Sequence, residues 1–232
     1  MITNLFQVTD IDETIVNDIL AYAGRLSRRG FVVNTLGNIA VRAAHRCDQE
    51  YGVSYTKHMG ISLEEMSRDN VVVTDIRDGN LLFGNSKPSI GHTMNRTIFR
   101  FRPDINAVIH AHVNDLIAWF SVSGETTLKY ISADTALILS KPVHVLAPNI
   151  NVETDATMLE EFVGQTNCVI MPNHGVTTFG RDLSEAYHRM TSLVAEVQRI
   201  VQAVFIARLT DKTINWISDE EVEQMYSCLL YT

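Results

Sequence analysis

Apolar residues recur at helical spacing along several parts of the chain. Ile11, Ile15, Ile19 and Leu26 predict an amphipathic helix that begins near Asp10, with Glu13 in its first turn, and ends before Gly30. Similar spacing predicts helices over residues 90–100, 114–121, 154–163 and 183–207, and a helical turn over 62–66. The apolar run 135–140 fits either a helix or a strand.

Other segments show the alternation or the β-branched runs that are typical of strands. They cover residues 38–42, 71–76, 81–83, 107–109, 143–146 and 168–171, and residues 31–34 fit a turn or a short strand. The dipeptide Asp78-Gly79 predicts a hairpin turn between two of them. Strands flanked by helices predict an α/β protein with three α/β/α layers. With only 5 Pro and 12 Gly, residues 1–232 leave no room for a long linker, so we expect a single domain.

Charge and composition exclude several classes of protein. The net charge is −8, and the densest basic group is only Arg25, Arg28 and Arg29, so we expect no nucleic-acid partner. The N-terminus lacks the pattern of a signal peptide, and the apolar runs are shorter than a membrane span requires. The lone cysteines Cys47, Cys168 and Cys228 are typical of a reducing compartment. We therefore expect a cytoplasmic protein without membrane contact.

Three histidines predict a metal site. His110 and His112 follow an apolar run, and residues two apart on a strand point to the same face. His174 lies just past the predicted strand 168–171, so the three rings can converge at neighbouring strand ends. Three histidines that leave one position open are typical of catalytic zinc. We interpret His110, His112 and His174 as ligands of one divalent ion, with Zn²⁺ as the first candidate and Fe²⁺, Mn²⁺ and Co²⁺ as alternatives.

The segments around these histidines resemble a known family. Residues 102–112, RPDINAVIHAH, are similar to the "RPDxNAVxHxH" segment of the class II aldolase and adducin proteins. Residues 173–186, NHGVTTFGRDLSEA, resemble their "NHGxxxxGxxLxEA" segment, and residues 35–42, TLGNIAVR, their "TxGNxSxR" loop. The resemblance extends from about residue 12 to residue 207. It implies a central mixed, mostly antiparallel sheet and a homotetramer with active sites between subunits.

The resemblance also implies a substrate site, from which this chain departs. The family binds phosphate with three loops, to which Thr35, Gly37, Asn38, Gly60 and Ser89 correspond. Met59 and Ile90, however, stand where the family has hydroxyl residues. Loss of hydroxyl donors disfavours a phosphate, so we expect a small substrate that lacks a phosphate or has an apolar part.

The family's acidic residue is missing as well. The family has an acid that helps to hold the metal and carries the proton, and Gly91 stands at that position. Candidates for the proton carrier are the neighbouring His92, or Tyr130, which would act from the next subunit.

The sequence as a whole predicts a metal-dependent carbon–carbon lyase of the aldolase or decarboxylase type. It would act on a small hydroxy-keto or keto-acid substrate through a metal-stabilised enediolate or enolate. Two other interpretations remain open, an Fe(II)-dependent oxygenase on the same fold and a non-catalytic adducin-like module.

Overall fold

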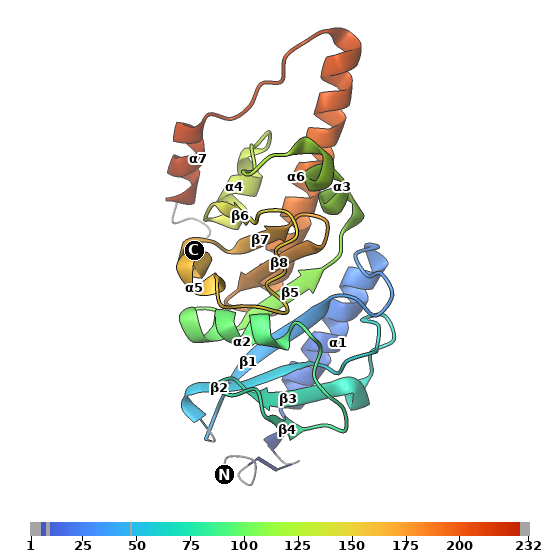
Figure 1. Cartoon of the computed structure of the whole chain (residues 1–232), viewed down its shortest axis with the longest axis vertical. Coiled ribbons are helices and arrows are strands. Elements are labelled where there is room, and N and C mark those ends of the chain that lie inside the picture. The colour runs from blue at the N-terminus through green and yellow to red at the C-terminus, as the bar shows by residue number, and fades with distance from the viewer. Residues whose placement is uncertain (1–5, 8–9, 47, 228–232) are drawn as a thin grey trace.

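An eight-stranded sheet forms the centre of the molecule (Figure 1). The computed structural model of the chain describes residues 6–7, 10–46 and 48–227. The order of the strands is β4-β3-β2-β1-β5-β8-β7-β6, and among them only β6 and β7 pair in parallel. The strands are β1 (Asn38–His45), β2 (Asp48–Lys57), β3 (Val71–Asp75), β4 (Leu81–Phe83), β5 (Ala107–Ala111), β6 (Val143–Val145), β7 (Cys168–Met171) and β8 (Gly175–Gly180). The expected mixed, mostly antiparallel sheet is thus confirmed.

Helices cover both faces of the sheet and complete the three layers. They are α1 (Glu13–Arg28), α2 (His92–Phe101), α3 (Asn114–Ser123), α4 (Ala133–Leu139), α5 (Leu159–Phe162), α6 (Leu183–Thr210) and α7 (Asp219–Tyr226), with short 3₁₀ turns η2 (Arg68–Asn70) and η3 (Val163–Gln165). One hydrophobic core lies between the sheet and α1, α3, α4 and α6. A second lies between the sheet and α2 with α5, and Figure 1 shows α2 crossing the front of the sheet.

Strand β5 contributes to both cores because its side chains alternate between the two faces. Ile109 and Ala111 belong to the core of α1 and α6, whereas Val108 belongs to the core of α2. His110 lies two residues beyond Val108 and therefore projects on the α2 side of the sheet. The same alternation directs Ala111 to the opposite face of the sheet from His110.

Some element boundaries differ from the sequence prediction. The first helix is capped by Asp12 rather than Asp10, because the Asp12 carboxylate accepts hydrogen bonds from the backbone N–H groups of Thr14 and Ile15. The helix expected over 154–163 is reduced to α5 and η3. The Asp155 side chain accepts the N–H of Thr157 and so holds the preceding residues in turns. The ambiguous run 135–140 lies largely in α4.

The two strands β2 and β8 were not expected at all. Gly52 interrupts the alternation of β2, and an added Cβ there would lie 2.1 Å from the carbonyl oxygen of Ala43. Strand β8 begins and ends with glycine, which weakens a strand signal. Both strands are nevertheless central, because β2 lies between β1 and β3, and β8 lies between β5 and β7.

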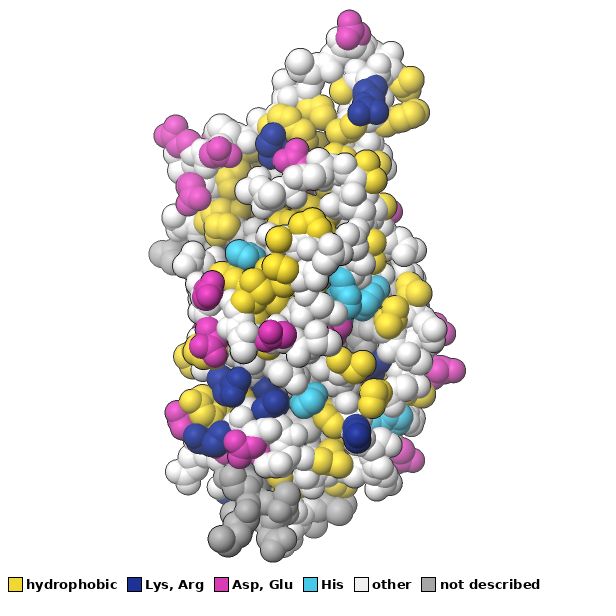
Figure 2. Space-filling view, in the orientation of Figure 1, with side chains coloured by type: hydrophobic (Ala, Val, Ile, Leu, Met, Phe, Trp, Pro, Cys, Tyr) yellow, Lys and Arg dark blue, Asp and Glu magenta, His cyan; other side chains and the backbone are white. Residues whose placement is uncertain are grey.

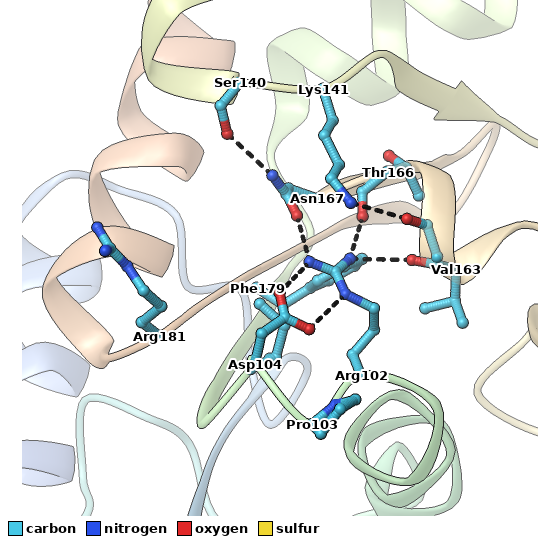
Figure 3. A network of polar contacts seen from close by, with 12 residues as sticks. Arg102, Pro103, Asp104, Ser140, Lys141, Val163, Thr166, Asn167, Phe179 and Arg181 are labelled. Atoms are coloured by element: carbon cyan, nitrogen blue, oxygen red, sulfur yellow. Dashed lines mark hydrogen bonds and ion pairs between the residues drawn. The ribbon is translucent and has the colours of Figure 1, made fainter. Parts of the chain in front are cut away.

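The arginine of the RPD segment precedes β5, at the opposite end of that strand from His110, and Figure 3 shows its polar contacts. The Arg102 side chain is buried and donates to the backbone carbonyls of Val163 and Thr166 and to the Asn167 side chain. It also forms a two-point ion pair with Asp104. All five guanidinium donors are therefore used, so this part of the motif is structural.

Helix α6 is the longest of the described helices and extends past the sheet (Figure 1). Its first half packs in the core, but Val201, Phe205, Ile206 and Leu209 near its end are exposed. By length and composition alone the helix could cross a membrane. Apolar residues earlier in the helix, among them Leu193, Val197 and Ile200, are buried in the protein core.

Candidate metal centre

The three histidines meet at one end of two neighbouring strands. His110 is the fourth residue of β5, and His112 follows that strand directly. His174 lies in the turn between β7 and β8, where Asn173 has a positive φ of 64° and the N–H of His174 donates to the carbonyl of Met171. Because β5 pairs with β8, the two strands bring the three rings together, as the sequence predicts.

The nitrogen atoms of the rings converge with one carboxylate. His110 Nε2 lies 3.0 Å from His112 Nε2 and 3.5 Å from Glu153 Oε2, and His174 Nε2 lies 2.9 Å from the same oxygen. One ligand atom from each of the four residues lies within 4.8 Å of the others. Ligands about 2.05 Å from a tetrahedral ion are separated by roughly 3.3 Å. The donor set and its spacing fit a divalent metal ion.

Glu153 is the member of the cluster that sequence reasoning missed. It lies in a loop between β6 and α5, far from the histidine motifs in the sequence, and its side chain is 11% exposed. No recognised motif surrounds it, and the helix expected to begin at Thr154 would have placed it at a solvent-exposed helix start. The only indication in the sequence was that Gly91 replaces the acid of the family motif, which left the cluster without a carboxylate.

Burial keeps the imidazoles of His110 and His112 uncharged. It lowers the pKa of His110 to about 4, and burial together with the His110 ring lowers that of His112 to about 4. Neutral imidazole is the form that binds a metal. For Glu153, burial acts to raise the pKa, but the facing rings of His110 and His174 lower it overall, so the carboxylate stays ionised.

A hydroxyl group fixes the tautomer of His110. Its Nδ1 lies 3.0 Å from Thr177 Oγ1, and that hydroxyl donates to Met94 Sδ at 3.5 Å. Since the hydroxyl proton is directed at sulfur, the oxygen accepts the Nδ1–H of His110. The lone pair of Nε2 is then free and points into the cluster. Such an orienting hydrogen bond is usual for metal-binding histidines.

Four of the five expected substrate-binding residues lie in three loops that are tied together, and the fifth, Asn38, begins β1. The buried Lys57 ammonium donates to the carbonyls of Thr35 and Ile61, at 2.5 and 2.7 Å, and so joins the first two loops. The N–H of Ser89 donates to the Lys57 carbonyl, which adds the third. Gly37 packs against β5, because an added Cβ would lie 2.8 Å from the carbonyl oxygen of His110. Gly60, with a positive φ of 88°, forms the turn before Ile61. Asn38 is fully buried and donates to Glu153.

A pocket with a volume of about 470 Å³ opens beside Glu153. His92 lines it, half-buried, and its Nδ1 contacts the carbonyl of Ser89 at 3.0 Å. Burial and the Arg96 guanidinium lower the pKa of His92, so the ring is neutral at neutral pH. The rest of the wall is mixed, with apolar, cationic and hydroxyl side chains, namely Met59, Pro88, Ile90, Lys87, Thr93 and Thr154, together with Gly79.

Tyr130 is not brought to the histidines of its own chain. Its side chain is buried, and its hydroxyl lies 2.9 Å from that of Tyr226 in α7. Burial and the neighbouring Tyr226 raise the pKa of Tyr130. A role for this residue in catalysis would require a site on a neighbouring subunit.

Comparison with known proteins identifies the family. Residues 17–200 match the family model described as the class II aldolase and adducin N-terminal domain. The chain is 27% identical to L-fuculose phosphate aldolase of Methanococcus maripaludis over 173 residues, which is 74% of this chain and 87% of the relative. Its fold is similar to that of YgbL from Escherichia coli, with a TM-score of 0.76, 19% identity, and coverage of 92% of this chain and 98% of that one. A solved L-fuculose 1-phosphate aldolase gives a TM-score of 0.73 at 21% identity, with coverage of 94% and 96%. The chain therefore belongs to the class II aldolase and adducin family.

Proposed function

We propose that this protein is a metal-dependent carbon–carbon lyase, of aldolase or decarboxylase type. The observation that carries this proposal is the convergence of His110, His112, His174 and Glu153 within 4.8 Å next to an open pocket. A relative from Methanococcus maripaludis is an L-fuculose phosphate aldolase, which agrees with lyase chemistry. Zn²⁺ is the first candidate for the ion because the donors are nitrogen-rich, and Fe²⁺, Mn²⁺ and Co²⁺ are the alternatives.

The three histidines would hold the ion, and as uncharged ligands they would leave it close to its full charge. When bound, such an ion supplies Lewis acidity toward a carbonyl substrate whose oxygen becomes negative as a carbon–carbon bond breaks. His110 and His112 need no proton loss before they bind at neutral pH, because burial lowers their pKa values to about 4.

The pocket wall supports a small substrate without a phosphate group. Met59, Pro88 and Ile90 present apolar surface, and Lys87 supplies a positive charge. Met59 and Ile90 offer no donor to a phosphate, which requires several, whereas the Lys87 ammonium group suits the carboxylate of a keto acid. The volume of about 470 Å³ lies in the range of small-molecule sites. We therefore propose a hydroxy-keto or keto-acid substrate with an apolar part.

Two side chains of the pocket are placed to carry a proton. Glu153 and the neutral ring of His92 both line it, so either can take or return a proton of a bound substrate. Tyr130 would act only from a second subunit, and its hydroxyl is already hydrogen-bonded to Tyr226.

We also propose that the protein is a cytoplasmic homotetramer. The acidic composition and the three isolated cysteines support the location. The exposed apolar end of α6, formed by Val201, Phe205, Ile206 and Leu209, supports contact with further copies of the chain. In Figure 2 apolar side chains gather near this protruding end of the molecule.

The metal content of wild-type protein and of His110→Ala tests the central proposal. Elemental analysis should find about one divalent ion per chain in the wild type and a small fraction of that in the variant, with unchanged circular dichroism. A variant that keeps the full ion content would refute the site.

A substrate panel then tests the reaction. Retro-aldol cleavage or CO₂ release should be detected with unphosphorylated hydroxy-keto or keto-acid compounds, and sugar phosphates should bind more weakly. Oxygen consumption by an iron-loaded sample would instead favour an oxygenase.

A further inference from the structure

Gly91, at the start of α2, leaves a space that another side chain fills. A Cβ at this position would lie 2.3 Å from Glu153 Oε1 and 2.3 Å from Asn38 Nδ2. The backbone there has an ordinary φ of −67°, so any residue could adopt the conformation. The requirement for glycine is therefore steric, and the group that imposes it is the Glu153 carboxylate with its hydrogen-bond donor.

A buried amide pair directs that carboxylate. Asn95 Nδ2 donates to Asn38 Oδ1 at 2.8 Å, which fixes the orientation of the Asn38 side chain. Asn38 Nδ2 then donates to Glu153 Oε1 at 3.2 Å, and the other oxygen, Oε2, faces His174 and His110. Both asparagines are fully buried, so water does not compete for these bonds.

The loop that carries Glu153 is anchored on both sides of it. The buried side chains Val152 and Ala156 pack in the core beneath α2 and α5. Asn151 Oδ1 accepts the backbone N–H of Glu153 at 2.9 Å, which closes a tight turn. The carboxylate is thus held in place by a packed loop rather than by a flexible surface segment.

We propose that Glu153 supplies the carboxylate of the metal centre from the 150–156 loop, through the space that Gly91 leaves, with Asn38 as its positioning residue. This inference rests on the proposed metal-dependent function. A side chain at position 91 and the carboxylate of Glu153 exclude each other. The acid that the family motif places at position 91 has therefore been replaced, in this chain, by one that reaches the same histidines from another loop.

Metal affinity of five variants tests the inference. Glu153→Gln removes the charge at constant shape, and Gly91→Ala should displace the carboxylate while Glu153 remains in the chain. Each should weaken Co²⁺ and Zn²⁺ binding at least tenfold, measured by competition with a chromophoric chelator. The double variant, Gly91→Ala with Glu153→Gln, should bind the metal about as well as the single variant with the lower affinity. Its affinity should not fall further, because both changes remove the same interaction. Asn38→Ala should weaken metal binding when it is made in the wild type. It should not weaken metal binding further when it is added to Glu153→Gln.

Matched controls separate this effect from a general loss of structure. Gly164→Ala adds a methyl group where no atom lies within 4 Å, and Glu160→Gln removes an exposed carboxylate from the neighbouring helix. Both should bind the metal like the wild type, and thermal melting should show that all variants are folded. Wild-type affinity in Glu153→Gln, or losses that multiply in the double variant, would overturn the inference. Such a result together with metal loss in His110→Ala would leave the proposed function intact, whereas a wild type without metal affinity would refute both.

Discussion

The hydroxyl group of Thr177 should control how strongly the metal binds, although it touches no ion. It accepts the Nδ1–H of His110 at 3.0 Å and so favours the tautomer whose Nε2 can bind a metal. Thr177→Val keeps the shape of the side chain but leaves that N–H, in a fully buried ring, without this partner. An unsatisfied buried donor costs about 1–3 kcal/mol.

The size of the loss follows from the partners that remain. In the metal-free variant, His110 can move its proton to Nε2, where Glu153 Oε2 at 3.5 Å can accept it. Metal binding reverses that shift, so the cost appears in the affinity. Loss of such an orienting partner lowers metal affinity about 10- to 100-fold, or roughly 1.4–2.8 kcal/mol. The Val176 backbone also hydrogen-bonds to the ring, so we expect the lower end, about tenfold.

Competition titration with Zn²⁺ or Co²⁺ measures this loss directly, and Thr178→Val is the matched control. Thr178 is the next residue of β8, equally buried, but its hydroxyl donates to the carbonyl of Ala186 at 2.8 Å. The control should lose about 1 kcal/mol of stability and keep its metal affinity. Equal affinities in wild type and Thr177→Val, or equal losses in both variants, would refute the role of Thr177.

Three further predictions concern parts of the molecule outside the metal ligands. Arg102→Met should lower the free energy of unfolding, measured by urea titration, by roughly 3 kcal/mol, because it removes the hydrogen-bond partner of two carbonyls and of Asn167. Asp104→Asn should lower it by less than about 1 kcal/mol. Similar urea midpoints for the two variants would contradict this. Burial lowers the pKa of Lys57 from 10.5 to about 8, so between pH 8 and 10 the unfolded chain binds more protons than the folded one and stability should rise. That rise should be absent from Lys57→Met, and equal pH slopes would speak against it. Leu209→Glu, on the exposed end of α6, should give a smaller species in light scattering than Gln202→Glu on the same helix, and an unchanged mass would count against α6 as a subunit contact.

The features that the sequence predicted well depend on contacts between near neighbours in the chain. The alternation of β5 places His110 and His112 on one side and Ala111 on the other, because strand geometry leaves no other arrangement. In α1 and α6, apolar residues recur every three or four positions, and this spacing likewise specifies which face of each helix is buried. His174 was predicted from its position after a buried strand, and the pairing of β5 with β8 brings its ring close to the other two.

What the sequence did not predict depends on segments that meet only in the folded chain. Strand β2 carries Gly52 and several polar residues, and its burial comes from β1 and β3 on either side. The tether from Lys57 to the loops of Thr35 and Ile61 has no sequence signature, because a lysine in an alternating segment ordinarily faces solvent.

The Glu153 carboxylate could not be located by comparing motifs alone. Compared with the family pattern, Gly91 indicates that an acid is absent. His92, the next residue, then becomes a candidate for the proton carrier. The structure places Glu153 Oε1 2.3 Å from where a Cβ of residue 91 would lie. A glycine at a position that is acidic in the family can therefore arise in two ways. Either the carboxylate has been lost, or the glycine leaves space for a carboxylate from another loop. Only the packing around that glycine distinguishes them, and here the buried Asn38 amide, directed at Glu153, favours the second.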